Sequence, residues 1–273
     1  MTVAAYVDVD FENQPQYVPG YTQEQLNTFN ASKGEFKKFA DNFDLINEGD
    51  WKELANNLQK AGGNANRIAR VMNQSNEGSC VGNMAAQACE YLQSRAVGRD
   101  KVIPISAMSM YKQIGSSPNS GANVGDSMKR AIDTGFLPLD TDANKQRFQH
   151  TMSHTGFRQP WPSGWKDTAK LFANCEAFVI DSYAEAFTAA LRGMCIGVGR
   201  AGHSILYLDP VFDDGAWFWD YVNSWGQWGF GKGQFDYGFG RDSSRYWKSA
   251  LDWAVAWEAA DTSGFEWILG TAA

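Results

Sequence analysis

The spacing of the apolar residues changes partway along this chain of 273 residues, and that change constrains the fold more than any other feature. From Ser79 to Gly98, apolar side chains recur at intervals of three and four residues, which predicts one helix with a buried face. From about residue 193, short β-branched and aromatic runs alternate with Gly, Asp and Pro, which is typical of strands joined by turns. Helices followed by an antiparallel sheet predict an α+β fold.

Other segments extend this layout. Helices are expected around 51–61, from about Asp126 to Gly135, and from about Ala184 to Arg192. The expected strands are the runs GMCIGVG, HSILYLD and AWFWDYVN, with a further one in GKGQFDYG. Residues 1 to about 20 show little periodicity and are interpreted as an extended arm.

The charge and the terminal sequence argue against several classes of partner. The net charge of −7 and the isoelectric point near 5.0 disfavour nucleic acid, because phosphate binding needs clustered Lys and Arg. No stretch reaches the ~18 consecutive apolar residues that a membrane helix needs. The N-terminus lacks a basic start and an apolar core, so no signal peptide is predicted. We therefore expect a cytoplasmic protein, or part of an assembled particle, with reduced cysteines.

Cys80 is the first candidate for chemistry. It stands at the expected start of the helix, directly after a Gly-Ser turn. The helix dipole and the free N–H groups at that end stabilise a thiolate and lower the pKa of the thiol. A lone cysteine is more often a small buried apolar residue, so this position alone does not establish a nucleophile.

His203 and Asn223 supply the two groups that such a cysteine needs. His203 opens an apolar strand after Gly202, and an imidazole there can act as the base that activates a thiol. Asn223 begins Asn-Ser-Trp-Gly, and its side-chain carbonyl can accept the second ring N–H of the histidine. Trp225 is expected to cover that hydrogen bond and to contribute to substrate binding. Each residue also has a purely structural interpretation, as a strand start or a local turn.

Gln74 is a candidate for stabilising negative charge on a substrate. It precedes Cys80 by six residues, in the polar stretch NQSNEGS. Its side-chain N–H and the backbone N–H of Cys80 can form an oxyanion hole.

These segments together resemble the papain family of cysteine peptidases. QSNEGSCVGNMAA is similar to the start of the family's nucleophile helix, GHSILYLD to its histidine strand, and YVNSWGQWGFGKGQF to its Asn-Ser-Trp-Gly segment. The order Gln, Cys, His, Asn is also that of the family. In SGANVGDSMKRAIDTG, the resemblance makes Gly125 the candidate for the glycine that binds the substrate backbone.

The resemblance implies a two-lobed fold with the active site in the cleft between a helical lobe and a β lobe. It implies a cysteine endopeptidase that cuts peptide or protein substrates through an acyl-enzyme, without metal or organic cofactor. Three positions depart from the family pattern: Val81 follows the nucleophile, Glu77 stands where a cysteine is common, and Val124 replaces a glycine. These departures concern specificity and secretion rather than the triad.

The resemblance covers about residues 70–240 and leaves both ends of the chain outside it. We interpret residues 1–60 as an N-terminal arm or propeptide-like extension, 61–243 as the catalytic domain and 244–273 as a C-terminal extension. A propeptide would pack across the cleft, whereas a permanent arm would not be removed. Either extension could bind a partner in an assembly.

Two alternatives of different kinds stay open. A peptidoglycan-cleaving amidase or endopeptidase uses the same Cys-His chemistry on a compact papain-like core, although such folds seldom carry Asn-Ser-Trp-Gly. The other alternative is a structural component of a larger assembly, for instance of a bacterial virus. A scaffold without activity would be expected to lose a catalytic residue, and this sequence retains all of them.

Overall fold

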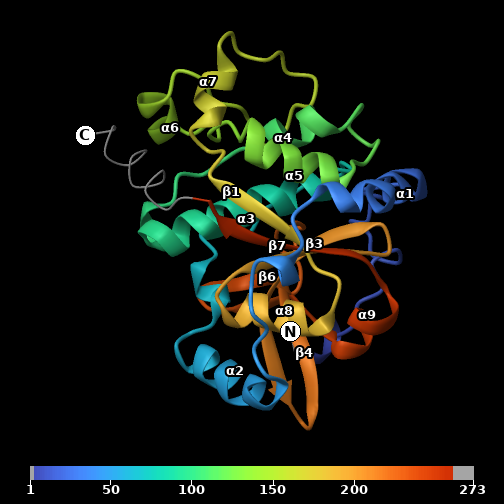
Figure 1. Ribbon diagram of the computed structural model, residues 1–273. Coiled ribbons are helices and arrows are strands. Elements are labelled where there is room, and N and C mark those ends of the chain that lie inside the picture. The colour runs from blue at the N-terminus through green and yellow to red at the C-terminus, as the bar shows by residue number, and fades with distance from the viewer. Residues whose placement is uncertain (1–2, 261–273) are drawn as a thin grey trace.

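The computed structural model describes residues 3–260 and has an α+β fold, as the sequence predicts. Figure 1 shows the arrangement of the elements. The helices are α1 (Gln23–Ser32), α2 (Trp51–Lys60), α3 (Cys80–Val97), α4 (Ala107–Ile114), α5 (Val124–Asp133), α6 (Asp142–Arg147), α7 (Trp165–Lys170), α8 (Tyr183–Leu191) and α9 (Ser244–Ser249). The strands are β1 (Cys175–Val179), β2 (Cys195–Arg200), β3 (His203–Asp213), β4 (Ala216–Val222), β5 (Phe230–Lys232), β6 (Phe235–Ser243) and β7 (Leu251–Ala259).

All seven strands join one antiparallel sheet in the order β1-β7-β2-β3-β4-β6-β5. The expected strands correspond to β2, β3, β4 and the β5–β6 hairpin. Strands β1 and β7 were not predicted. β7 pairs with β1 on one side and with β2 on the other, so most of its residues are buried and its sequence lacks a polar alternation.

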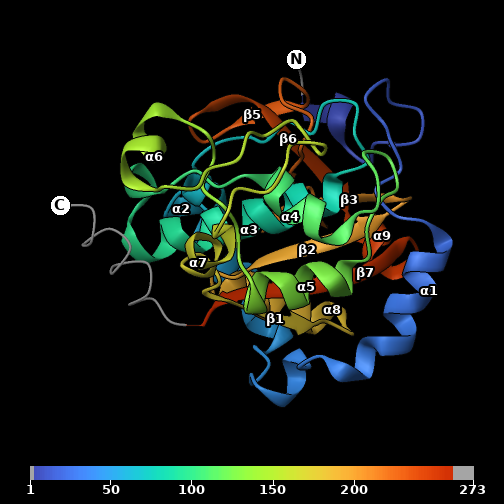
Figure 2. The same cartoon turned by 90° about the horizontal axis from the view of Figure 1, so that it is seen from above.

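The sheet is covered on both faces. Helix α3 packs against β2, β3 and β7, and α5 packs against β1, whereas α8 and α2 pack against strands from the opposite side. Figure 2 looks onto α4 and α5, with the sheet beneath them. Successive β7 residues alternate between the two cores: Val255 belongs to the core of the α3 face, and Ala256 to the core of the α8 face.

The central place of β7 changes the interpretation of the C-terminal segment. Residues 244–259 form α9 and β7, and β7 lies inside the sheet. The boundary proposed after residue 243 therefore cuts through the sheet, and the segment up to Ala259 belongs to the same core as α3 and β3. Residues 261–273 lie outside the described part of the chain.

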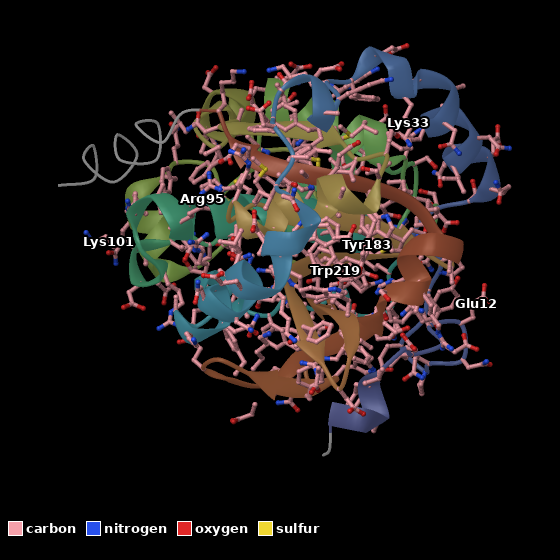
Figure 3. The ribbon with its side chains drawn as sticks, turned by 60° about the horizontal axis from the view of Figure 1, so that its bottom comes forward. Glu12, Lys33, Arg95, Lys101, Tyr183 and Trp219 are labelled. Carbon is pink, nitrogen blue, oxygen red and sulfur yellow. The ribbon has the colours of Figure 1, made fainter. Side chains whose placement is uncertain are left out.

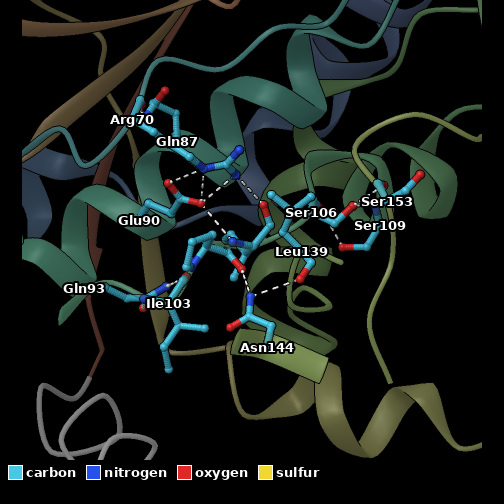
Figure 4. Close-up of polar contacts among 12 residues, drawn as sticks. Arg70, Gln87, Glu90, Gln93, Ile103, Ser106, Ser109, Leu139, Asn144 and Ser153 are labelled. Carbon is cyan, nitrogen blue, oxygen red and sulfur yellow. Dashed lines mark hydrogen bonds and ion pairs between the residues drawn. The ribbon is translucent and has the colours of Figure 1, made fainter. Parts of the chain in front are cut away.

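Helix α3 begins and ends where the sequence predicts, at Cys80 and before the C-cap Gly98. It is buried along most of its length, so its polar side chains need partners. Glu90 pairs with Arg70 at 2.7 Å and also accepts the backbone N–H of Ile105 at 2.8 Å, as Figure 4 shows. This network links α3 to the loops that precede and follow it in the chain.

Aromatic rings fill the core on the α8 face. Tyr183 and Trp219 lie next to each other in the interior, with ring centroids 6.3 Å apart (Figure 3). Trp219 also stacks on Tyr207 at 5.4 Å, and Phe187 lies between Trp51 and Trp219. These contacts join α2 and α8 to β3 and β4, because rings this large bury much apolar area.

The N-terminal arm packs against the body of the protein along its length. Val7 forms a β-bridge with Arg241 of β6, and Lys38 forms one with Val179 of β1. Arg200, which is buried, donates a hydrogen bond to the backbone carbonyl of Val9 at 2.8 Å. Within residues 3–260, no helix is long and apolar enough to cross a membrane.

Candidate active site

Cys80 is the first residue of α3, and its side chain is fully buried. The N-cap residue is Ser79, as predicted, but its side chain makes no capping hydrogen bond. The backbone N–H of Ser204, directly after His203, donates to the Cys80 Sγ at 3.2 Å. The turn between β2 and β3 therefore brings the start of the histidine strand to the nucleophile, although 124 residues separate Cys80 from Ser204 in the sequence.

His203 and Asn223 form the predicted hydrogen bond, with 2.8 Å between His203 Nε2 and Asn223 Oδ1. Asn223 Oδ1 also accepts the backbone N–H of Ser224 at 2.7 Å, which identifies this atom as the oxygen. His203 Nε2 must then carry the proton and donate it. The neutral ring is left with Nδ1 as its basic nitrogen, and Nδ1 has no hydrogen-bond partner among the described residues.

Two aromatic residues shield this pair. Trp225 stacks on the His203 ring with centroids 4.6 Å apart and an interplanar angle of 27°. Phe11, from the arm, meets the same imidazole edge-on at 4.8 Å. Trp225 thus covers the His203–Asn223 hydrogen bond, as expected, but it is only 4% exposed and offers little surface to a substrate in this arrangement.

Gln74 is hydrogen-bonded to the Asn-Ser-Trp-Gly segment. Its backbone N–H donates to the Ser224 carbonyl at 2.8 Å, and its Oε1 accepts the Ser224 hydroxyl at 2.6 Å. Its Nε2 donates to the carbonyl of Glu77 at 2.9 Å, in the loop that leads to Cys80. An amide nitrogen has two hydrogens, so one remains for an oxyanion. The contacts hold the Gln74 amide close to the start of α3.

Burial keeps both reactive groups neutral in this arrangement. Burial raises the pKa of Cys80 to about 11, although hydrogen bonds from Ser204 act in the opposite direction. Burial lowers the pKa of His203 to about 4, while its hydrogen bond to Asn223 opposes this and the nearby Arg200 adds to it. These shifts favour a neutral thiol and a neutral imidazole in this arrangement, not the thiolate–imidazolium pair of an activated cysteine.

Gly20 of the arm accounts for that burial. A Cβ atom built on Gly20 would lie 1.7 Å from the Cys80 Sγ, so the backbone of the arm rests directly on the nucleophile. The Gly20 N–H donates to the Gly202 carbonyl at 2.8 Å, and the Gly20 carbonyl accepts the Ala122 N–H at 2.7 Å. The arm is thus held on both sides of Cys80, by the β2–β3 turn and by the loop before α5.

Gly125 does not take part in this arrangement. Its N–H donates to the side chain of Asn123 at 2.7 Å, and Asn123 is the N-cap of α5. The helix therefore begins at Val124, two residues before the expected Asp126, and Gly125 lies in its first turn. A Cβ there would meet the Phe36 ring at 3.0 Å. A Cβ on Gly121 would instead lie 2.8 Å from the Gly20 backbone. Gly121, not Gly125, lies where the chain crosses Cys80.

Sequence reasoning missed what the arm contributes through Phe11, Gly20 and Tyr21, and what β7 contributes through Asp252. It also missed the two glycines that hold or meet the arm, Gly121 before α5 and Gly202 in the β2–β3 turn. A signal was present in YVPGYT, where Pro-Gly stands between two tyrosines in an otherwise polar arm. The spacing of residues within the arm does not indicate which distant segment of the chain such a turn contacts. Among residues 3–260, no group of three or more His, Cys, Asp or Glu side chains is arranged to hold a metal ion.

Solved structures with a similar fold are cysteine proteases. The chain matches xylellain, a cysteine protease from Xylella fastidiosa, with a TM-score of 0.52 and 16% identity over 70% of this chain and 83% of xylellain. It matches the ragweed pollen cysteine protease Amb a 11, in its proform, with a TM-score of 0.55 and 14% identity over 89% and 77% of the two chains. It matches a recombinant stem bromelain precursor with a TM-score of 0.55 and 13% identity over 92% and 86%.

No protein-family model matches the sequence, and no curated protein matches it by sequence. Identities of 13–16% speak for a shared fold, and the predicted papain-like fold is confirmed.

Proposed function

We propose that this chain, whose fold is that of the papain-like cysteine proteases, is a peptidase that uses Cys80, His203 and Asn223 as a triad. His203 Nδ1 takes the thiol proton, and Cys80 Sγ attacks the carbonyl carbon of a peptide bond. The Gln74 side chain and the Cys80 backbone N–H stabilise the oxyanion. His203 then protonates the leaving amine, which leaves an acyl thioester on Cys80. A water molecule, deprotonated by His203, attacks the thioester and releases the acid.

One observation carries this proposal. The hydrogen bond of 2.8 Å between His203 and Asn223 fixes the imidazole in the tautomer whose basic nitrogen is Nδ1. The same strand start contacts the Cys80 Sγ through Ser204. A histidine and a cysteine that served only the core would not need a third residue to set the proton position.

The covered nucleophile indicates that the described form is closed. A substrate reaches Cys80 only after the backbone around Gly20 moves away, and that movement restores water to the thiol and the imidazole. This supports a propeptide-like role for the arm. N-terminal sequencing of active protein distinguishes removal of the arm from movement of an intact one.

The test is cleavage of a mixed peptide library by the wild-type chain and by a Gly20→Ala chain, whose new methyl group cannot fit beside Cys80. We expect cleavage by the Gly20→Ala chain and none when Cys80→Ala is added. Cys195→Ala, added to the Gly20→Ala chain in the same way, is the matched control, because it also removes a buried thiol but leaves the site intact. Cleavage that persists without Cys80, or no cleavage by any of these chains, would contradict the proposal.

A further inference from the structure

The residue after Gly20 fills a side-chain pocket beside the nucleophile. The Tyr21 ring enters the space between the start of α5 and the start of β7, where Ala122, Val124 and Trp253 line it. Its ring centroid lies 6.1 Å from that of Trp253, and the side chain is only 7% exposed. Ala122, Val124 and Trp253 belong to the body of the protein and remain when the arm leaves, whereas the other walls, Gln25, Leu26 and Phe29, are part of the arm.

A carboxylate ends this pocket. The Tyr21 hydroxyl donates to Asp252 Oδ2 at 2.5 Å. No Lys, Arg or His within residues 3–260 forms an ion pair with Asp252, although nearly every other buried or half-buried acid on this sheet has a cationic partner, for example Asp220 with Arg241. Burial, together with the Asp252 charge, raises the pKa of Tyr21, so the hydroxyl keeps the proton that it donates. Tyr21 is the group that satisfies Asp252.

We propose that Asp252 and Trp253 form a specificity pocket, and that the substrates are peptides that place a tyrosine in it, as Tyr21 does. This inference rests on the proposed peptidase function and names the substrate class of the same site. Gly20 and Tyr21 are consecutive, so a side chain in this pocket belongs to the stretch of peptide that lies directly on Cys80.

The physical basis is discrimination by a half-buried charged acceptor. A hydrogen bond to a charged group contributes more than one between neutral groups, and a phenylalanine in the same pocket would leave the carboxylate without its partner. The Trp253 indole that lines the pocket packs well against an aromatic ring, whereas a small side chain would bury little area against it. Asp or Glu in the substrate would meet a like charge and be rejected.

The experiment compares peptides that differ only in carrying Tyr, Phe, Lys or Glu at one position, scanned along the cleaved stretch. The Gly20→Ala chain cleaves them, and kcat/KM is measured for each. At one position we expect tyrosine to exceed phenylalanine by about 10-fold to 100-fold, as the loss of a charge-assisted hydrogen bond implies. Asp252→Leu should bring this ratio close to one, because it lowers kcat/KM for the Tyr peptide and relieves the unpaired carboxylate that the Phe peptide leaves, and Asp252→Asn should give an intermediate ratio.

The outcomes separate the two proposals. If the Gly20→Ala chain cleaves none of the peptides, both the proposed peptidase function and the proposed specificity pocket are refuted. If it cleaves them without a preference for tyrosine, or prefers lysine, the pocket assignment alone is overturned. The same holds if Asp252→Leu lowers all rates equally, because a structural role of Asp252 would reduce every peptide alike and would not move the Tyr-to-Phe ratio.

Discussion

Replacing Gly20 with alanine tests the closed arrangement most directly. The added Cβ would lie 1.7 Å from Cys80 Sγ and 3.3 Å from Cys80 Cβ. Non-bonded heavy atoms need about 3.5–4 Å, so the arm must move by roughly 2 Å at this point. A shift of that size breaks the hydrogen bonds from Gly20 to Gly202 and from Ala122 to Gly20, which are 2.8 and 2.7 Å long.

The magnitude follows from those two bonds. Each contributes about 0.5–1.5 kcal/mol net, so the closed form loses about 1–3 kcal/mol relative to an open one. At about 1.4 kcal/mol per factor of ten, the open population rises by roughly 5-fold to 150-fold. The rate at which iodoacetamide labels Cys80 should rise by the same factor, because only the open form exposes the thiol.

The assay is the labelling rate of Cys80, followed by peptide mapping so that Cys89, Cys175 and Cys195 serve as internal references. Gly34→Ala is the matched control: it is also in the arm, but a Cβ there would meet nothing within 4 Å. A Gly20→Ala chain that labels Cys80 no faster than the wild type and the Gly34→Ala chain would refute the reasoning, since the arm could not then be what covers the nucleophile.

Three further results are expected. In the Gly20→Ala background, Gln74→Ala should lower kcat by about 10²–10³ with little change in KM, because the oxyanion forms only in the transition state; an equal rise in KM would instead indicate a role in binding. In a Cys80→Ala chain, His203 stays neutral when folded, with its pKa lowered to about 4, whereas the unfolded imidazole binds a proton below about 6.5. The stability present above pH 6.5 is therefore lost as the pH falls toward 4, by up to about 3 kcal/mol in urea unfolding, and adding His203→Gln should remove this part of the pH dependence. Arg200→Leu leaves Asp242 buried without its cation and should lower the free energy of unfolding by about 3–5 kcal/mol, and adding Asp242→Asn should restore part of it. Equal stability of the single and double variants would show that the unpaired Asp242 charge is not what destabilises the protein.

Much of the fold, and the hydrogen bond between His203 and Asn223, could be predicted because the signals were local. The periodicity of α3 and the alternation of short apolar runs with turn residues depend on neighbours in the sequence. Cys80, His203 and Asn223 each stand in a motif of a few residues, and their order along the chain was enough to indicate one site. Strand β7 was not predicted because both of its faces are largely buried. Its sequence therefore lacks the alternation of polar and apolar residues that would have distinguished a strand from an apolar tail.

The sequence by itself determined which groups can do chemistry and which elements carry them: a thiol at a helix start, an imidazole at a strand start and an amide after the next strand. Only the tertiary structure decided that Gly20 lies on the thiol, that Gly121 rather than Gly125 meets the Gly20 backbone, and that Tyr21 reaches Asp252. Tyr21 and Asp252 are 231 residues apart, and no local pattern specifies such a contact. It exists because the arm and β7 pack against the same core, and this packing determines whether the nucleophile is covered.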